Sequence, residues 1–312
     1  MATRHTCMYE LAFCESPSIS RSRYARLSGS MTMIDIAGWI LGALILLGLV
    51  SLVMLFQARF IYFPPRYSTT QLEEARKVGV QEVKFRTSQG NQAAFFWRSE
   101  DSDIAPRHMW LLFGGNGDVA LAWVSLIRSF PDPRSGYLLI DYPAYGICDG
   151  RPNPETILEN SERALQVLRE EKGWNLGPDT LCVLGHSLGG AAALQFAAKN
   201  PVRKILAVST FTTMDDMVRT QIRIPLGRLL RHRFDNVASL KTILEQKKIP
   251  EIFLFHGKAD EIIPPRMGRA LANLDPIRIK FSEIPGASHN DIFQMPLPQS
   301  LQSALFGPVA AD

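Results

Sequence analysis

The composition describes one sizeable globular domain with an appendage. The chain has 312 residues, of which 46% are hydrophobic, and a formal net charge of +4. No run of lysine and arginine is interleaved with aromatic residues, so nucleic acid is not an expected partner. The four cysteines form no Cys-x-x-Cys pair, and His, Asp and Glu form no cluster with metal-ligand spacing. Because no dinucleotide-binding motif follows a strand either, we expect neither a metal nor a cofactor.

The amino-terminal region divides into a polar and an apolar part. Residues 1–33 are rich in serine and arginine and are predicted to be poorly ordered. Residues 34–57 are nearly continuously apolar, and from Ile36 they carry no charge for about 20 residues, enough for a helix to cross about 30 Å of hydrocarbon. A buried core helix would rarely be apolar on all sides, and a signal peptide would need a small-residue cleavage site, which residues 57–60 lack. We therefore predict a single-pass transmembrane helix.

Positive charges flank this apolar stretch on both sides: Arg21, Arg23 and Arg26 before it, and Arg59 and Arg66 after it. Their slight excess on the amino side favours a cytoplasmic amino terminus, with the carboxyl-terminal domain on the non-cytoplasmic side. Met31 and Met33 are alternative translation starts. If translation began there, the amino-side charges would be lost and the opposite orientation would be favoured.

Residues 58–312 are predicted to form one α/β domain. Residues 81–86 and 92–97 alternate in hydrophobicity around a turn at 89–91, as in an antiparallel hairpin. Further apolar strands, at 109–113, 137–141, 180–184 and 203–209, alternate with helical stretches at 119–129 and 155–172. This order predicts a mostly parallel sheet flanked by helices with right-handed crossovers.

A glycine-rich loop follows the strand predicted at 109–113. It reads Gly-Gly-Asn-Gly-Asp over residues 114–118. Glycines allow a backbone to approach a substrate carbonyl closely, so the N–H of Gly115 is predicted to stabilise an oxyanion. The alternative is an ordinary Gly-Asn turn with no catalytic role.

The pentapeptide at residues 185–189, Gly-His-Ser-Leu-Gly, carries most of the functional signal. It follows the apolar strand 180–184 and precedes an alanine-rich helical stretch, so the order is strand, tight turn and helix. A serine on such a turn is exposed to a base, and we predict Ser187 as a nucleophile. The N–H of Leu188 is the second predicted oxyanion donor. The alternative is that Ser187 merely caps the helix.

Two further side chains complete a predicted Ser-His-Asp arrangement. Asp260 lies just past an apolar strand at 252–257, and His289 lies in a small-residue loop beyond the strand at 277–281. The carboxyl ends of parallel strands meet at one edge of a sheet, where both side chains can reach Ser187. His289 would take the serine proton, and Asp260 would hold the imidazole in the required tautomer.

Weaker candidates compete for these roles. His186 should point away from the direction of attack, and His256 is expected to pack against a loop or bond to it. Glu283 and Asp291 are rivals of Asp260, although Asp291 is too close in sequence to reach the far ring nitrogen of the histidine. Residues 210–250, between two predicted strands, are expected to form a short helical insert near the site.

These motifs resemble the α/β-hydrolase superfamily, in particular membrane-anchored serine hydrolases without a large cap domain, related to the prolyl-oligopeptidase-like group. The matching segments are residues 60–65, 141–146, 185–189 and 256–260. Two departures stand out. The oxyanion loop begins Phe-Gly-Gly at 113–115 rather than His-Gly-Asn, and Pro143 and Ala144 replace the usual Arg and Gly.

The sequence thus predicts a membrane-tethered serine hydrolase that cleaves an ester, thioester or amide through an acyl-enzyme intermediate. The expected partner is an acyl-containing substrate, a lipid or an acylated protein, because the domain is held near a bilayer. Three alternatives stay open: a non-catalytic binding protein of the same fold, an acyltransferase, and a peptidase with the same three residues.

Overall fold

The computed structural model describes residues 32–306 except 101, 224–226 and 295, and the side chains of 53–55, 222 and 228 are also outside the description. The prediction for residues 1–33 therefore falls almost entirely outside the described part. The chain divides into two units, residues 1–51 and 52–312.

Helix α1 (Met33–Ile61) contains the predicted apolar stretch. Residues 33–52 are long and apolar enough to cross a membrane, and none of them is buried. Such a segment near the amino terminus fits a membrane anchor or a signal sequence. The helix continues past residue 57, where the sequence suggested that it would end. Pro64 and Pro65 follow it, and a proline disfavours helical geometry in the residue before it.

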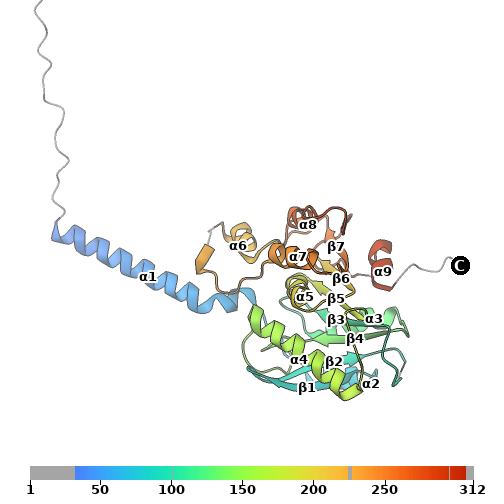
Figure 1. Cartoon of the computed structure of the whole chain (residues 1–312). Helices are drawn as coiled ribbons and strands as arrows, with labels where there is room; N and C mark the ends of the chain where they lie inside the picture. Colours follow the sequence, from blue (N-terminus) through green and yellow to red (C-terminus); the bar gives the residue numbers. More distant parts are fainter. Residues whose placement is uncertain (1–31, 101, 224–226, 295, 307–312) are drawn as a thin grey trace, which may run out of the picture. The chain divides into compact units, whose positions relative to one another are not determined.

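An eight-stranded sheet forms the centre of the second unit (Figure 1). Its strands are β1 (Gln81–Thr87), β2 (Gly90–Trp97), β3 (His108–Phe113), β4 (Ser135–Ile140), β5 (Leu181–His186), β6 (Lys204–Val208), β7 (Glu251–Gly257) and β8 (Ile279–Ile284). Their order is β1-β2-β4-β3-β5-β6-β7-β8. The first two pairings are antiparallel and the others are parallel. The predicted α/β-hydrolase fold is confirmed.

Helices cover both faces of this sheet. They are α2 (Thr69–Lys77), α3 (Trp123–Ser129), α4 (Pro154–Lys172), α5 (Leu188–Lys199), α6 (Met214–Ile222), α7 (Asn236–Leu244), α8 (Pro265–Ala272) and α9 (Gln299–Phe306), with short turns η1 (Ala120–Ala122) and η2 (Gly227–Leu229). Successive strand residues point to opposite faces of the sheet and so belong to two separate hydrophobic cores. Leu111 and Val183 pack with α4, α5, α7 and α8, whereas Trp110 and Leu184 pack with α2, α3 and α9.

The sequence dictates where the longest of these surface helices begins and ends. Asn153 caps α4 by accepting the N–H of Thr156 at 2.8 Å, and Pro154 occupies the first turn, where no intrahelical N–H bond is lost. Gly173 ends the helix at φ 65°, a left-handed conformation that glycine adopts without strain. Helix α4 therefore closely follows the predicted stretch 155–172.

The region 210–250 contains two helices with different positions. Helix α7 packs against α5, and its side chains Leu240 and Ile243 are fully buried in the core. Helix α6 instead contributes to the wall of a pocket at the carboxyl edge of the sheet. Only part of the predicted insert therefore lies at the site.

Candidate active site

Ser187 sits on a strained turn between β5 and α5. Its φ is 57° and its ψ is −119°, an unusual conformation for a residue other than glycine. The flanking glycines are sterically required: a Cβ at Gly185 would overlap the carbonyl of Gly189, and one at Gly189 would overlap the carbonyl of Phe113. The turn therefore lifts the serine hydroxyl to the edge of the sheet, as the pentapeptide indicated.

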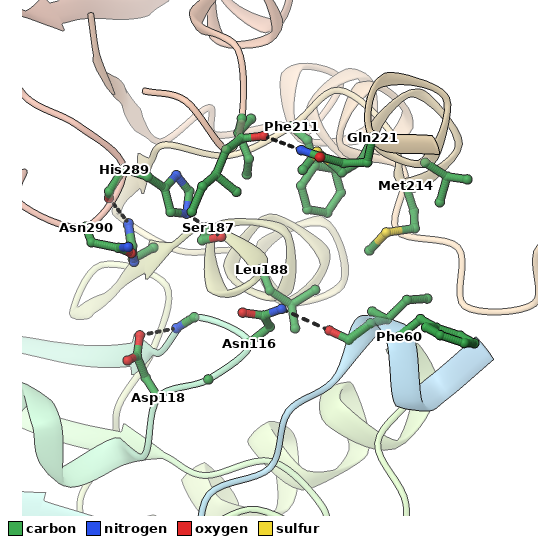
Figure 2. A pocket seen from close by; sticks show the side chains of 18 of the residues that line it. Phe60, Asn116, Asp118, Ser187, Leu188, Phe211, Met214, Gln221, His289 and Asn290 are labelled. Atoms are coloured by element: carbon green, nitrogen blue, oxygen red, sulfur yellow. Dashed lines mark hydrogen bonds between the residues drawn. The ribbon is translucent and has the colours of Figure 1, made fainter. Parts of the chain in front are cut away.

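The structure brings Ser187, His289 and Asp260 together in one hydrogen-bonded chain. The Nε2 atom of His289 lies 3.0 Å from Oγ of Ser187, and its Nδ1 lies 2.8 Å from Oδ2 of Asp260. All three side chains are buried. An ionised carboxylate only accepts hydrogen bonds, so the ring proton is on Nδ1 and Nε2 accepts the serine hydroxyl. Figure 2 shows His289 directed toward Ser187 at the side of the pocket.

Asp260 is held as a carboxylate by several donors. Its Oδ2 accepts from His289 and lies 3.2 Å from Nε2 of His256, and its Oδ1 accepts the N–H groups of Ile262 and Ile263. Burial alone would raise the pKa of Asp260, but the bonds from His256, His289 and the Ile263 N–H outweigh it and hold this pKa well below its usual range. Asp260 therefore stays ionised at neutral pH.

The two rival histidines support the site without reaching the serine hydroxyl. The Nε2 atom of His256 also donates to the carbonyl of Ile263 at 2.8 Å. The ring of His186 lies beside that of His289, with centroids 4.9 Å apart and planes tilted by 39°, and its Nε2 donates to the carbonyl of His289 at 2.9 Å. Burial, together with the neighbouring His289, lowers the pKa of His186 to about 4, so it is a neutral donor at physiological pH.

The rival acids are engaged elsewhere. Asp291 accepts the N–H of Ser288 at 2.6 Å and so shapes the loop that carries the histidine. The half-buried Glu283, on β8, pairs with Arg269 at 3.0 Å. Among the acids weighed from the sequence, Asp260 is the one placed on His289.

The two predicted oxyanion donors differ in the hydrogen bonds that their N–H groups make. Leu188 is the first residue of α5, so its N–H has no acceptor within the helix and lies beside Ser187 at the pocket. The N–H of Gly115 instead donates to Oδ2 of Asp118 at 3.0 Å. Gly115 lies at the pocket as predicted, but a side-chain carboxylate now occupies the N–H that was assigned to the oxyanion.

The sequence offered no indication of a role for the buried carboxylate of Asp141, which bonds to the segment after this loop. Asp141 accepts the N–H of Ala120 and the hydroxyl of Tyr67, each at 2.7 Å. Burial raises the pKa of Asp141 to about 6, although these two bonds favour its ionised form. The hydroxyl of Tyr67 also accepts the N–H of Leu121, so this pair fixes the segment that follows the glycine-rich loop.

The pocket beside Ser187 has a volume of about 590 Å³, within the usual range for small-molecule sites. Part of its wall comes from the end of α1, through Gln57, Phe60 and Ile61, which the sequence did not predict. An apolar stretch expected to lie in a membrane gives no indication that the residues after it line a site. Among the described residues, no three His, Cys, Asp or Glu side chains gather in a way that could hold a metal ion.

Residues 110–243 match the model of the Alpha/beta hydrolase family. Protein bem46 of Schizosaccharomyces pombe is 34% identical over 158 residues, which cover 49% of this chain and 51% of bem46. An uncharacterized protein of Mycobacterium tuberculosis is 22% identical over 250 residues, covering 80% of this chain and 86% of that protein. The chain thus spans about half the length of bem46. Residues 110–243, less than half of the chain, are thus similar to this family, and the chain has the α/β-hydrolase fold.

Solved structures share the fold at low identity. An esterase of Pyrococcus furiosus superposes with a TM-score of 0.54 at 13% identity, covering 75% of this chain and 91% of the esterase. A lidless α/β serine hydrolase of Xanthomonas campestris superposes with a TM-score of 0.51 at 14% identity, covering 77% of this chain and 94% of that protein. At these identities the likeness establishes the fold.

Proposed function

We propose that this chain is a serine hydrolase that cleaves a carboxylic ester or thioester through an acyl-enzyme, with Ser187, His289 and Asp260 as its catalytic residues. The observation that carries the proposal is their continuous hydrogen-bonded chain at a pocket, with the serine on a strained turn. The esterase and serine hydrolase that share the fold support a hydrolase activity in general. The chemistry of the three side chains narrows it to nucleophilic acyl transfer.

The first half-reaction acylates Ser187. As its Oγ forms a bond to the carbonyl carbon, the hydroxyl proton passes to Nε2 of His289, and the ionised Asp260 stabilises the resulting imidazolium. The carbonyl oxygen becomes an oxyanion. His289 then returns its proton to the leaving alcohol or thiol as the bond to that group breaks, which leaves the acyl group on Oγ.

The second half-reaction restores the enzyme. A water molecule gives a proton to Nε2 of His289 while its oxygen attacks the acyl carbon. When the tetrahedral intermediate collapses, the proton returns to Oγ of Ser187 and the carboxylic acid leaves. An alcohol in place of water would transfer the acyl group instead, and an amide in place of the ester would make the enzyme a peptidase or amidase.

We assign oxyanion stabilisation to the N–H groups of Leu188 and Gly115. The first faces the pocket at the start of α5. The second becomes available when the exposed Asp118 carboxylate moves aside. Two donors of this kind contribute several kcal/mol to a tetrahedral transition state, on the order of 3 kcal/mol for each.

We further propose that α1 is retained as a membrane anchor. The helix runs without interruption from the apolar stretch to Ile61, and Gln57 near its end is buried in the hydrolase domain. Loss of this helix end would strip a wall from the pocket. The catalytic domain is proposed to lie on the non-cytoplasmic side. Protease treatment of sealed microsomes should leave it intact, and its digestion without detergent would reverse this orientation.

The catalytic assignment is tested with the full chain in detergent micelles and p-nitrophenyl butyrate as the substrate. Wild type should release p-nitrophenol, and Ser187→Ala should lose nearly all of this activity. Ser209→Ala is a matched control, because Ser209 is also buried and also has a positive φ at the end of a strand. Turnover that survives in Ser187→Ala would exclude the proposal. A folded wild type without turnover would favour a binding protein, and ester products formed with added alcohols would indicate an acyltransferase.

A further inference from the structure

The pocket has a polar end and an apolar end. Ser187, His289, Asn116 and Asp118 lie at the polar end. The remaining wall is largely apolar and includes Phe60, Ile61, Met214, Met217, Val218 and Leu230. Figure 2 shows Ser187 between the two groups, with His289 and Asn290 on one side and Phe60 and Met214 on the other. A chain attached to a carbonyl at Ser187 would therefore extend over apolar side chains.

The end of α1 is fixed in the wall by hydrogen bonds on two sides. The side-chain amide of Gln57 donates to the carbonyl of Leu229 at 2.7 Å and accepts the N–H of Arg231 at 2.8 Å. On the other side, the amide of Asn116 donates to the carbonyl of Ile61 at 3.1 Å. The helix end thus connects the oxyanion loop with residues 229–231 at the end of η2, and it forms a fixed part of the pocket wall.

Part of the rim of the pocket is apolar and exposed. Phe60 is 72% exposed and Ile262 is 38% exposed, and both line the pocket. Residues 53–59 alone separate Phe60 from the stretch that is long enough to cross a membrane, and they cover about 10 Å as a helix. Exposed apolar side chains so close along the chain to such a stretch suit contact with a lipid surface rather than with water.

From these observations we propose, on the basis of the hydrolase function proposed above, that the pocket is an acyl-chain site and that its substrates are fatty acyl esters or thioesters drawn from a membrane. Phe60 and Met217 are its specificity-determining residues, one on α1 and one on α6. The chain lies along this wall with its carbonyl at Ser187, and the bond that breaks is the one between the acyl carbon and its alcohol or thiol.

Burial of a methylene group in such a wall favours binding by about 0.8 kcal/mol, which corresponds to roughly fourfold in kcat/KM for each added methylene until the pocket is filled. An octanoyl ester should therefore be hydrolysed with a kcat/KM at least about a hundredfold above that of the acetyl ester. This selectivity should depend on side chains of α1 and α6 that lie away from the reacting atoms.

The experiment uses the full chain in detergent micelles with p-nitrophenyl acetate, butyrate, octanoate and decanoate. The octanoyl-to-acetyl ratio of kcat/KM should fall by about tenfold or more in Phe60→Ala, which removes part of the wall, and in Met217→Trp, which fills the pocket. Phe63→Ala is the matched control, because Phe63 is also exposed but does not line the pocket, and its ratio should equal that of wild type. Fluorophosphonate labelling of each variant verifies that the site is folded.

Two outcomes separate this inference from the function on which it rests. Ser187-dependent turnover with a flat chain-length profile, or with a profile that Phe60→Ala and Met217→Trp leave unchanged, would overturn the acyl-chain site and leave the hydrolase intact. If none of the four esters is hydrolysed in a Ser187-dependent way, both proposals fail together.

Discussion

Two buried carboxylates at the carboxyl edge of the same sheet have pKa values that are shifted in opposite directions. Asp260, after β7, has a pKa well below its usual range, whereas the pKa of Asp141, after β4, is raised to about 6. Asp260 accepts two backbone N–H groups and has two imidazole donors at its other oxygen. Asp141 accepts one backbone N–H and one hydroxyl. Burial raises the pKa of both acids, and the number and kind of their donors decide whether this effect is outweighed, as at Asp260, or only reduced, as at Asp141.

The comparison also separates two roles. The donors around Asp260 keep this carboxylate ionised beside His289, which must become cationic during catalysis. Around Asp141 the partners are parts of the scaffold: the hydroxyl of Tyr67 and the start of η1. We therefore expect changes at Asp260 to affect chemistry first and changes at Asp141 to affect stability and its pH dependence.

The largest expected effect is that of Asp260→Asn. An amide at this position would favour the wrong tautomer of His289 and would not stabilise its cationic form, so kcat/KM should fall on the order of 10⁴-fold. The measurement is ester hydrolysis by the full chain in micelles. Glu283→Gln is the control, because that acid pairs with Arg269 and not with His289, and its kcat/KM should stay within about twofold of wild type. A decrease in kcat/KM of less than about a hundredfold in Asp260→Asn would contradict the catalytic role assigned to this carboxylate.

The second prediction concerns the pH dependence of the free energy of unfolding. Asp141 has a folded pKa above its unfolded value, so the stability it contributes is present below about pH 4 and is lost as pH rises through about 6. The loss amounts to about 3 kcal/mol. Relative to wild type, Asp141→Asn should gain about this much in urea unfolding between pH 3.5 and pH 7. A stability difference that does not change with pH would contradict the raised pKa.

Asp260 should give the opposite slope in the same experiment. Its folded pKa is below its unfolded value, so its contribution is present above about pH 4 and is lost as pH falls toward the folded pKa. Asp260→Asn should therefore remove stability at neutral pH and flatten the acid side of the curve. Parallel curves for the two variants would show that the two carboxylates do not differ as described.

A smaller effect is expected at the oxyanion loop. Asp118→Asn removes the negative charge from the N–H of Gly115, and kcat/KM should rise by about tenfold if this N–H serves the oxyanion. Asp149→Asn is the control, because the exposed Asp149 also accepts a backbone N–H, that of Asn91, and does not line the pocket. A lower kcat/KM in Asp118→Asn alone would mean that the carboxylate builds the loop rather than blocking it.

The smallest effect should come from Ala144, three residues after Asp141. Its φ is 73°, in the left-handed region, where a Cβ is strained and where glycine is the usual residue of the resembled motif. Ala144→Gly should relieve this strain, which by itself would raise the free energy of unfolding by about 1 kcal/mol. The larger backbone entropy that glycine loses on folding offsets part of this gain, so the net increase is smaller. The melting temperature of the variant in micelles is the measurement, and a decrease would show that the strain is absent.

The positions of Ser187, Asp260 and His289 could be predicted because each follows a strand whose apolar run is visible in the sequence. Parallel strands bring their carboxyl ends to one edge, so the sequence order of such residues nearly fixes their convergence. The α/β fold was predictable for the same reason, from apolar runs separated by amphipathic stretches. The extra turn of α1, up to Ile61, was not, because it depends on packing as well as on the prolines that follow.

The remaining parts of the site depend on contacts between distant segments. Nothing near Asp118 indicates that its carboxylate would occupy the N–H of Gly115. The contact of His256 with Asp260 forms only in the folded chain, and the raised pKa of Asp141 follows from burial, which also depends on the complete fold. In the same way, the sequence indicates only that Gln57 and Phe60 end an apolar helix. Their position in the pocket wall depends on the packing of residues 229–231 against this helix end, which the sequence does not show.

The most direct test of the account is covalent labelling of the full chain with a fluorophosphonate, followed by intact mass and peptide mapping. Wild type should gain one adduct, on Ser187, and Ser187→Ala should gain none. An adduct on another residue, or a folded wild type that stays unlabelled at pH 7–8 while a known serine hydrolase reacts, would contradict the claim that His289 and Asp260 make this serine a nucleophile.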